Sequence, residues 1–158
     1  MKNIDLTLTY QELTFDELAP REQELVTLAR VASQRAYAPY SKFQVGAAIL
    51  LSNGEIVTGS NQENAAFPSG TCAERTAAFW AHSQYPKAAF KAIAVAAFNT
   101  SGREIEEPVA PCGAGRQVLL EFEKLAVDNV KVLLVGHNKI YVIDSVKSLL
   151  PFAFIDFE

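Results

Sequence analysis

The sequence predicts an α/β domain, in which one mixed sheet of about five strands is covered by helices on both faces. Segments with the apolar spacing of a helix alternate along the chain with short apolar runs of strand length. The Asn53-Gly54 pair between two of these runs is typical of a tight hairpin turn. The expected order is helix, hairpin, helix, strand, helix, strand and strand, and this interleaving favours a sheet with helices on both sides.

The first third of the chain is expected to form a helix and the hairpin. Alternation of apolar and polar residues over 4–10 is a weak indication of an extended segment. Pro20 suits the first turn of a helix over about 20–36, which the following Ala-Pro pair brings to an end. Residues 43–51 and 55–60 are the expected strands of the hairpin.

The rest of the chain alternates helices, strands and polar loops before an aromatic tail over 152–157. Helices are expected over 76–83 and 116–126, with a short one over 145–150 that Pro151 ends. Strands are expected over 92–98, 130–135 and 140–143.

At 158 residues, with 49% hydrophobic and 20% charged residues, the chain is expected to form a single domain over 1–158. Its net charge of −4 and its lack of a basic cluster argue against nucleic acid as a partner. No apolar run is long enough to span a bilayer, and the first residues lack the core of a signal peptide. A cytoplasmic location without a membrane partner is therefore expected, where two cysteines are more often ligands, catalytic groups or buried side chains than a disulfide.

Both cysteines stand directly before a predicted helix: Cys72 is followed by Ala73-Glu74, and Cys112 is preceded by a proline. The free N–H groups and the dipole at a helix N-terminus favour a thiolate. Two such thiolates facing each other would form half of a zinc site. Taken singly, each feature has a simpler interpretation, because Thr71 and Glu74 have the spacing of a capping box and isolated cysteines are usually small buried hydrophobic residues.

Together these motifs resemble those of the small cytidine deaminases of nucleoside salvage. Zinc deaminases carry a metal ligand two residues before a glutamate that is not a ligand, followed later by Pro-Cys-x-x-Cys. The matching segments occur here in the same order and extend the resemblance from about residue 37 to residue 154. They are the stretch 37–48, Asn61-Gln62-Glu63-Asn64-Ala65, Cys72-Ala73-Glu74-Arg75, Pro111-Cys112-Gly113-Ala114, Arg116-Gln117-Val118-Leu119 and Leu149-Leu150-Pro151-Phe152-Ala153-Phe154.

The resemblance implies a three-layer α/β/α fold, a zinc cofactor, a pyrimidine nucleoside substrate and a homotetramer. It implies that zinc-activated water deaminates cytidine or deoxycytidine while Glu74 moves the protons. Cys72 and Cys112 would bind the metal, and Arg75 would offset the charge of their sulfurs. The residues that the resemblance assigns to the substrate are Phe43, Asn61, Glu63, Ala73 and, from a neighbouring subunit, Phe154. The competing interpretations are core packing for Phe43, turn chemistry for Asn61 and Glu63, and a solvated helix charge for Arg75.

Gly115 departs from the family pattern, which has a cysteine here as the third zinc ligand, whereas glycine has no donor side chain. Catalytic zinc is usually held by three protein ligands. His82 is a poor replacement because it lies ten residues after Cys72 on one helix, about 15 Å away, and the sequence does not place His137. Three hypotheses stay open: an impaired zinc-dependent deaminase, a non-catalytic nucleoside-binding oligomer without metal, or an altered or misread residue 115. The preference for ribose, deoxyribose or a modified nucleoside also stays open.

Overall fold

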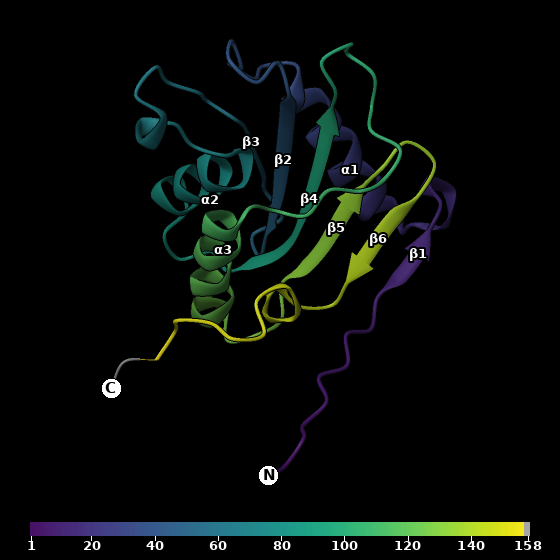
Figure 1. Ribbon diagram of the computed structural model, residues 1–158, viewed down its shortest axis with the longest axis vertical. Helices are drawn as coiled ribbons and strands as arrows, with labels where there is room; N and C mark the ends of the chain where they lie inside the picture. Colours follow the sequence, from purple (N-terminus) through teal and green to yellow (C-terminus); the bar gives the residue numbers. More distant parts are fainter. Residues whose placement is uncertain (157–158) are drawn as a thin grey trace.

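A computed structural model describes residues 1–156 as a sheet packed between helices (Figure 1). The sheet has six strands in the order β1-β6-β5-β4-β2-β3. They are β1 (Gln11–Leu13), β2 (Gln44–Leu51), β3 (Ile56–Ser60), β4 (Phe90–Phe98), β5 (Lys131–Val135) and β6 (Ile140–Ile143). Strands β4 and β5 run parallel and the other paired strands run antiparallel, so the sheet is mixed, as predicted.

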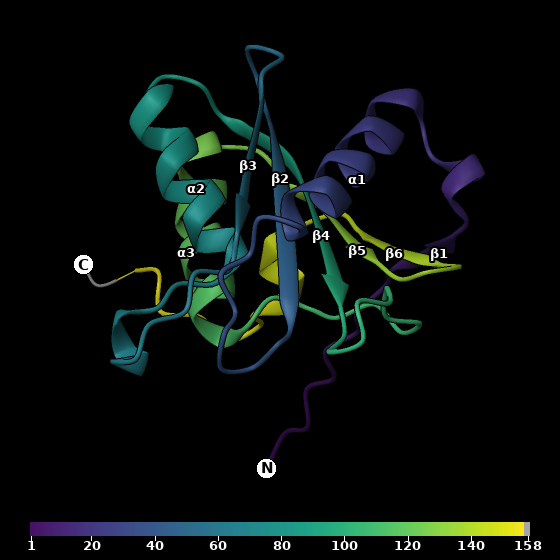
Figure 2. The same ribbon diagram turned by 90° about the horizontal axis from the view of Figure 1, so that it is seen from above.

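The helices cover both faces of this sheet, which confirms the predicted three-layer arrangement. Helix α1 (Pro20–Ser33) lies on one face, and α2 (Ala73–Gln84) and α3 (Gly113–Ala126) lie on the other (Figure 2). Successive side chains of β2 point to opposite faces, so Ala47 and Ile49 join the core under α2 and α3 while Ala48 joins the core under α1. No helix within residues 1–156 has both the length and the apolar character needed to cross a membrane.

The ends of the chain differ most from the expectations. The expected five strands become six because the three residues of β1 pair with β6, and a strand this short leaves no alternating pattern to detect. The extended segment over 4–10 is exposed and precedes that strand. The short helix over 145–150 is a 3-10 helix, Val146–Leu149. The aromatic tail is described as far as residue 156, so its last aromatic residue lies outside the described residues.

Two glycines let the helices approach the sheet closely. A Cβ atom at Gly46 in β2 would lie 2.1 Å from the backbone oxygen of Ala29 in α1. A Cβ atom at Gly59 in β3 would lie 2.5 Å from the backbone nitrogen of Ala77 in α2. Any larger residue would push these helices away from the sheet, so Gly46 fixes the position of α1, and Gly59 fixes that of α2 and of the preceding residue, Cys72.

Glu123 fixes α3 to the segments just before β5 and just after β6. Its side chain is buried and accepts hydrogen bonds from the backbone N–H groups of Val130 and Val146 and from the hydroxyl of Ser145, each at 2.8 Å. This carboxylate therefore ties α3 to the start of β5 and to the 3-10 helix, which fixes the direction of the helix that begins after Cys112.

Candidate active site

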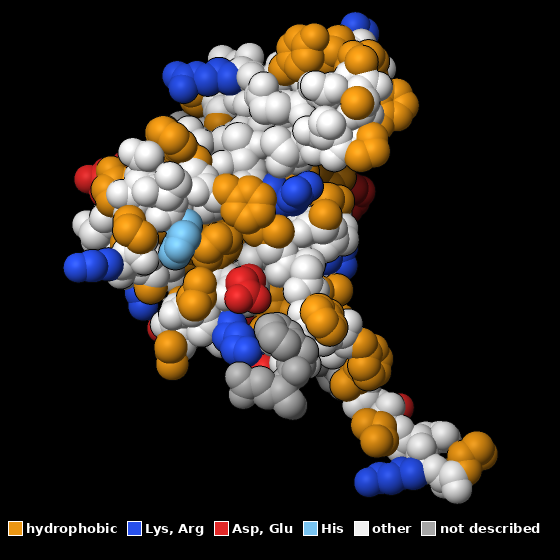
Figure 3. Space-filling view, turned by 90° about the vertical axis from the view of Figure 1, so that its left-hand side faces the viewer, with side chains coloured by type: hydrophobic (Ala, Val, Ile, Leu, Met, Phe, Trp, Pro, Cys, Tyr) orange, Lys and Arg blue, Asp and Glu red, His pale blue; other side chains and the backbone are white. Residues whose placement is uncertain are grey.

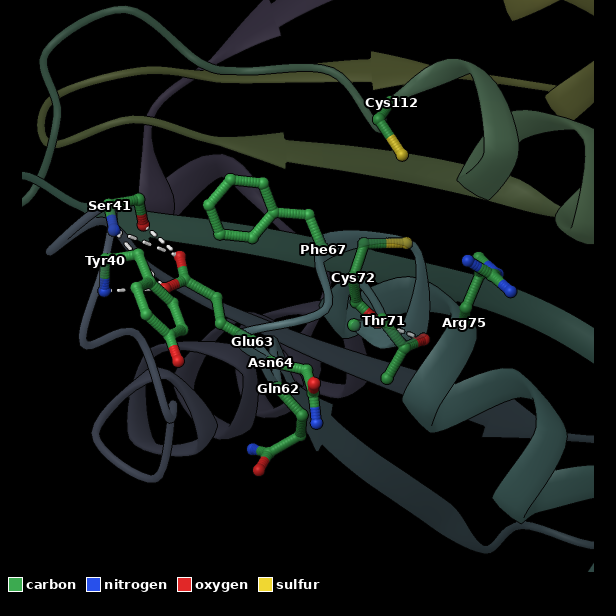
Figure 4. A pocket seen from close by; sticks show the side chains of 11 residues that line it. Tyr40, Ser41, Gln62, Glu63, Asn64, Phe67, Thr71, Cys72, Arg75 and Cys112 are labelled. Carbon is green, nitrogen blue, oxygen red and sulfur yellow. Dashed lines mark hydrogen bonds between the residues drawn. The ribbon is translucent and has the colours of Figure 1, made fainter.

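The two cysteines are the N-cap residues of α2 and α3, so both stand at helix N-termini, although the helices begin three residues earlier than the sequence indicated. Cys72 precedes Ala73 in α2, and the Sγ of Cys112 accepts a hydrogen bond from the backbone N–H of Gly115 at 3.4 Å. In Figure 4 both sulfurs lie on the same side of a pocket as the guanidinium of Arg75. Neither thiol is in a disulfide within the described residues; Cys72 is partly buried and Cys112 is exposed.

Glu74 is not part of a capping box, so that simpler interpretation of the sequence is wrong. The cap of α2 is Cys72 rather than Thr71. The Glu74 side chain is only 3% exposed, and its Oε2 has no hydrogen-bond partner among the described residues. Buried polar atoms are usually paired, and a buried unpaired carboxylate oxygen is typical of a group kept for a ligand or for chemistry.

A cavity of about 200 Å³ brings most of the predicted site residues together. They are Phe43, Asn61, Cys72, Ala73, Glu74 and Cys112. Four apolar residues that the sequence analysis did not single out complete the wall, namely Val45, Val95, Val109 and Ala110. Apolar residues on strands and in a loop carry no sequence signal that separates a pocket wall from a core. Because apolar walls enclose one buried carboxylate and two thiols, the cavity can hold a flat, uncharged ring beside the reactive side chains.

A larger cavity of about 420 Å³ reaches the same two sulfurs from the other side, and Glu63 and Arg75 line it (Figure 4). The carboxylate of Glu63 accepts hydrogen bonds from the backbone N–H of Tyr40 at 2.9 Å and from the hydroxyl of Ser41. These hydrogen bonds, that of Ser41 above all, hold the pKa of Glu63 below its usual value, so the carboxylate is ionised at neutral pH. The sequence analysis missed the part of Tyr40 and Ser41, because these donors meet Glu63 only when two loops that are distant in the sequence come together.

Asn61 connects the loop after β3 to the start of β2. Its Oδ1 accepts a hydrogen bond from the backbone N–H of Val45 at 2.8 Å, and its Nδ2 donates to the backbone oxygen of Phe43 at 2.9 Å. The amide therefore holds the wall of the smaller cavity in place and keeps one further hydrogen and one lone pair for a ligand.

The contacts of Arg75 and Phe154 within the described chain do not by themselves give these residues their predicted roles at the metal and at the substrate. The guanidinium of Arg75 lies over the ring of Phe79, 5.8 Å from its centre. Phe154 is 73% exposed, and its backbone oxygen accepts a hydrogen bond from Gln117 Nε2 at 2.6 Å. Phe154 thus lies beside α3 and does not join the other predicted site residues of its own chain.

Gly115 lies beside Cys72 and Glu74, so a side chain at this position would begin next to the two predicted site residues. A Cβ atom at this position would lie 3.5 Å from Cys72 Sγ and 3.6 Å from Glu74 Cδ. Neither histidine replaces the missing donor, because the ring of His82 lies against Phe122 and the ring of His137 lies beside Glu104. Within residues 1–156, no three side chains of the metal-binding types are grouped to hold an ion. The donor set therefore does not fit a complete catalytic zinc site, since it lacks one sulfur.

The environment of Cys72 makes its thiol a poor nucleophile in the metal-free protein. Burial, together with the nearby carboxylate of Glu74, raises the pKa of the Cys72 thiol well above its usual range. We expect an alkylating reagent at pH 8 to modify Cys112 at least about tenfold faster than Cys72, because reactivity follows exposure and the thiolate fraction. Mass spectrometry of the two cysteine peptides over time measures this ratio, and equal rates would contradict the assignment.

Apart from one ligand, the site has the pattern of a zinc-site deaminase: Cys72 stands two residues before the buried Glu74, and Cys112 follows a proline. Residues 20–138 match the family model described as the cytidine and deoxycytidylate deaminase zinc-binding region, and the chain belongs to this family.

Similar proteins agree with this assignment. A cytidine deaminase of Halalkalibacterium halodurans is 42% identical over 132 residues, which cover 84% of this chain and 92% of that protein. A cytidine deaminase of Sporosarcina psychrophila is 48% identical over 100 residues, which cover 63% of this chain and 68% of that protein. The crystal structure of a cytidine deaminase from Burkholderia pseudomallei aligns with a TM-score of 0.70 and 39% identity, over 83% of this chain and 97% of that one.

Proposed function

We propose that the chain binds cytidine or deoxycytidine and deaminates it hydrolytically to the uracil nucleoside, at a rate lowered by Gly115. The observation that carries this proposal is the buried carboxylate of Glu74, which lines one apolar cavity together with two thiols and whose Oε2 has no hydrogen-bond partner among the described residues. The family and the names of the relatives support the reaction and substrate. Zinc is the cofactor that the family implies, and we assign Cys72 and Cys112 as its remaining ligands.

Glu74 is the group that can move protons in this cavity. Deamination replaces the amino group on C4 of the pyrimidine with an oxygen from water and releases ammonia. Protons must pass from the water to the ring nitrogen N3 and to the leaving amine, and these atoms are neighbours. One carboxylate within reach of them can therefore act first as base and then as acid.

The rest of the site would hold the nucleoside. Phe43 would flank the base in the smaller cavity, and Ala73 would contribute to its wall. Asn61 and Glu63 would bind the sugar hydroxyls. An ionised carboxylate at the sugar attracts hydroxyl donors and repels phosphate, so the free nucleoside is favoured over its phosphorylated forms.

A homotetramer would complete the site, with Phe154 reaching a neighbouring subunit. Hydrophobic side chains are exposed across the face on the α2 side of the molecule (Figure 3). The exposed large hydrophobic residues of α2, α3 and the tail include Phe79, Trp80, Leu125, Phe152 and Phe154. A surface with this many exposed apolar side chains is typical of a subunit interface. Light scattering in solution measures the number of chains, and a monomer would contradict this arrangement.

Calorimetry with cytidine, combined with chromatography of the products, tests the proposed function. We expect cytidine to bind and uridine to form slowly, with a rate that rises when zinc is added. The Phe43→Leu variant, which keeps an apolar side chain but loses the flat ring, should bind cytidine about tenfold more weakly, because stacking on a base contributes about 1–3 kcal/mol. Binding without any uridine would favour a non-catalytic nucleoside-binding oligomer, for which Gly115 is the supporting observation. Absence of binding would contradict both functions.

A further inference from the structure

The segment before β1 carries a row of exposed apolar side chains. Figures 1 and 2 both show this segment running away from the body of the molecule. Its large apolar residues alternate with polar ones, and they are Ile4 (74% exposed), Leu6 (64%), Leu8 (51%) and Tyr10 (48%). Apolar residues at every second position are typical of a strand with one buried face. The pattern therefore indicates a segment that packs against something other than the described part of its own chain.

This segment leads directly into the edge strand of the sheet. Strand β1 is the first in the strand order, and its neighbour is β6, so its other edge presents unpaired backbone N–H and C=O groups to a further strand. The ring of Tyr10 already lies against that of Tyr141 in β6, with 4.9 Å between the ring centres. Tyr141 packs against the core under α2 and α3, so the apolar face of the segment continues that side of the sheet.

The segment is complementary to a second copy of itself. When two copies of residues 2–12 run antiparallel with Thr7 opposite Thr7, every large apolar residue faces another, and the two ends face charges of opposite sign. The facing pairs, each formed twice, are Ile4 with Tyr10, Leu6 with Leu8, and Lys2 with Glu12. All of these side chains are exposed and available for such contacts.

Other registers lose this match. A centre one residue earlier would place Lys2 opposite Tyr10, and a centre one residue later would place Ile4 opposite Glu12. A centre between two residues would place apolar side chains opposite polar ones throughout, because successive side chains point to opposite faces. The matching register is also closed, since residue i faces residue j and j faces i, which is the contact of a two-fold dimer.

We propose that residues 2–12 form an antiparallel two-stranded ribbon with the same residues of a second copy of this chain. The two-fold axis passes at Thr7, and the free edge of each β1 pairs with residues 2 and 3 of the other copy, so the two sheets continue into each other. The ribbon lies before residues 20–138, which match the family model, and the inference does not rest on the proposed reaction.

Cysteines placed in the ribbon test the contact and its register. Two Thr7→Cys chains would have their new thiols directly opposite each other, within reach of a disulfide. The matched control is Thr9→Cys, on the same polar face, because residue 9 and its copy would lie four residues apart, about 13 Å along the strand. With copper phenanthroline as oxidant at micromolar protein, Thr7→Cys should form the covalent dimer at least about tenfold faster, since a disulfide needs Cα atoms within about 7 Å.

Peptide mass spectrometry identifies the bond between the two copies of residue 7 and separates it from bonds made by Cys72 and Cys112. Equal rates for Thr7→Cys and Thr9→Cys would overturn the proposal, because they would reflect random collisions. Absence of any bond between the two copies of residue 7 would also overturn it, as expected for a segment that binds a different protein or folds back on its own chain.

Substitutions on the two faces of the ribbon test what holds it together. In the Thr7→Cys chain, replacing Leu6 and Leu8 with serine should slow the cross-linking by about tenfold, because both facing leucine pairs are lost. Replacing Asn3 and Thr9 with serine, on the polar face, should change it by less than about twofold. All four side chains are exposed, and thermal unfolding verifies that each variant folds. An equal effect of the two double substitutions would contradict a ribbon held by its apolar face.

Discussion

Gly115→Cys should raise the zinc affinity of the chain and its rate of cytidine deamination together, each by roughly 100-fold or more. The expected size follows from the metal, since the loss of residues that only support its ligands costs roughly 10–100-fold and a ligand itself should contribute more. The geometry favours a simple outcome: the new Cβ would make ordinary contacts with Cys72 Sγ and Glu74 Cδ. Metal analysis after dialysis and the initial rate of uridine formation are the two measurements.

The matched control is Gly113→Cys, two residues earlier in α3. Nothing lies within 4 Å of a Cβ atom at Gly113, so this thiol has space but does not contact Cys72 or Glu74. It should change neither zinc content nor rate by more than about twofold, since it adds no ligand. If Gly115→Cys leaves both quantities at the native level, position 115 is not the third ligand position. If Gly113→Cys raises them equally, the gain comes from any additional thiol.

The sequence predicted the parts of the fold that depend on local pattern. The hairpin follows from Asn53-Gly54, and the chain does turn there between β2 and β3. The helices after Cys72 and Cys112 follow from their apolar spacing, although they begin at Ala73 and Gly113, earlier than expected. Helix starts are hard to predict because the cap in each case is a cysteine, which is not among the usual capping residues.

Other features depend on contacts between distant residues and could not be predicted. Strand β1 exists because Gln11 pairs with Val142 at the edge of the sheet, and its three residues carry no pattern of their own. The ordering of Glu63 by Tyr40 and Ser41 depends on how two loops meet. For Glu74, the resemblance assigned a catalytic role, whereas the capping-box spacing taken alone favoured a local hydrogen bond. Its side chain lines a cavity that five separate segments enclose, and its Oε2 has no hydrogen-bond partner among the described residues.

Glu74→Gln should lower the rate of deamination by roughly 10²–10⁴-fold, the range that general acid–base catalysis contributes. The change is best made in the Gly115→Cys background, where the higher rate makes the loss measurable. Glutamine keeps the size of the side chain and can still form hydrogen bonds to the nucleoside, but it cannot accept a proton from water at neutral pH. Cytidine affinity measured by calorimetry should therefore change by less than about tenfold, or about 1.4 kcal/mol.

The same substitution should stabilise the metal-free protein, which separates a catalytic role from a structural one. Glu74 is 3% exposed and its Oε2 has no hydrogen-bond partner among the described residues, and a carboxylate that ionises in such a place costs more than a buried neutral amide. The free energy of unfolding of metal-free Glu74→Gln should rise by about 1 kcal/mol or more, as measured by urea denaturation. Glu74→Asp, which keeps the carboxylate but shortens its reach, should lose activity without this gain in stability. A metal-free Glu74→Gln protein that is less stable than the native chain would show that Glu74 supports the fold. A deamination rate within about tenfold of that of Gly115→Cys alone would exclude Glu74 as the proton carrier.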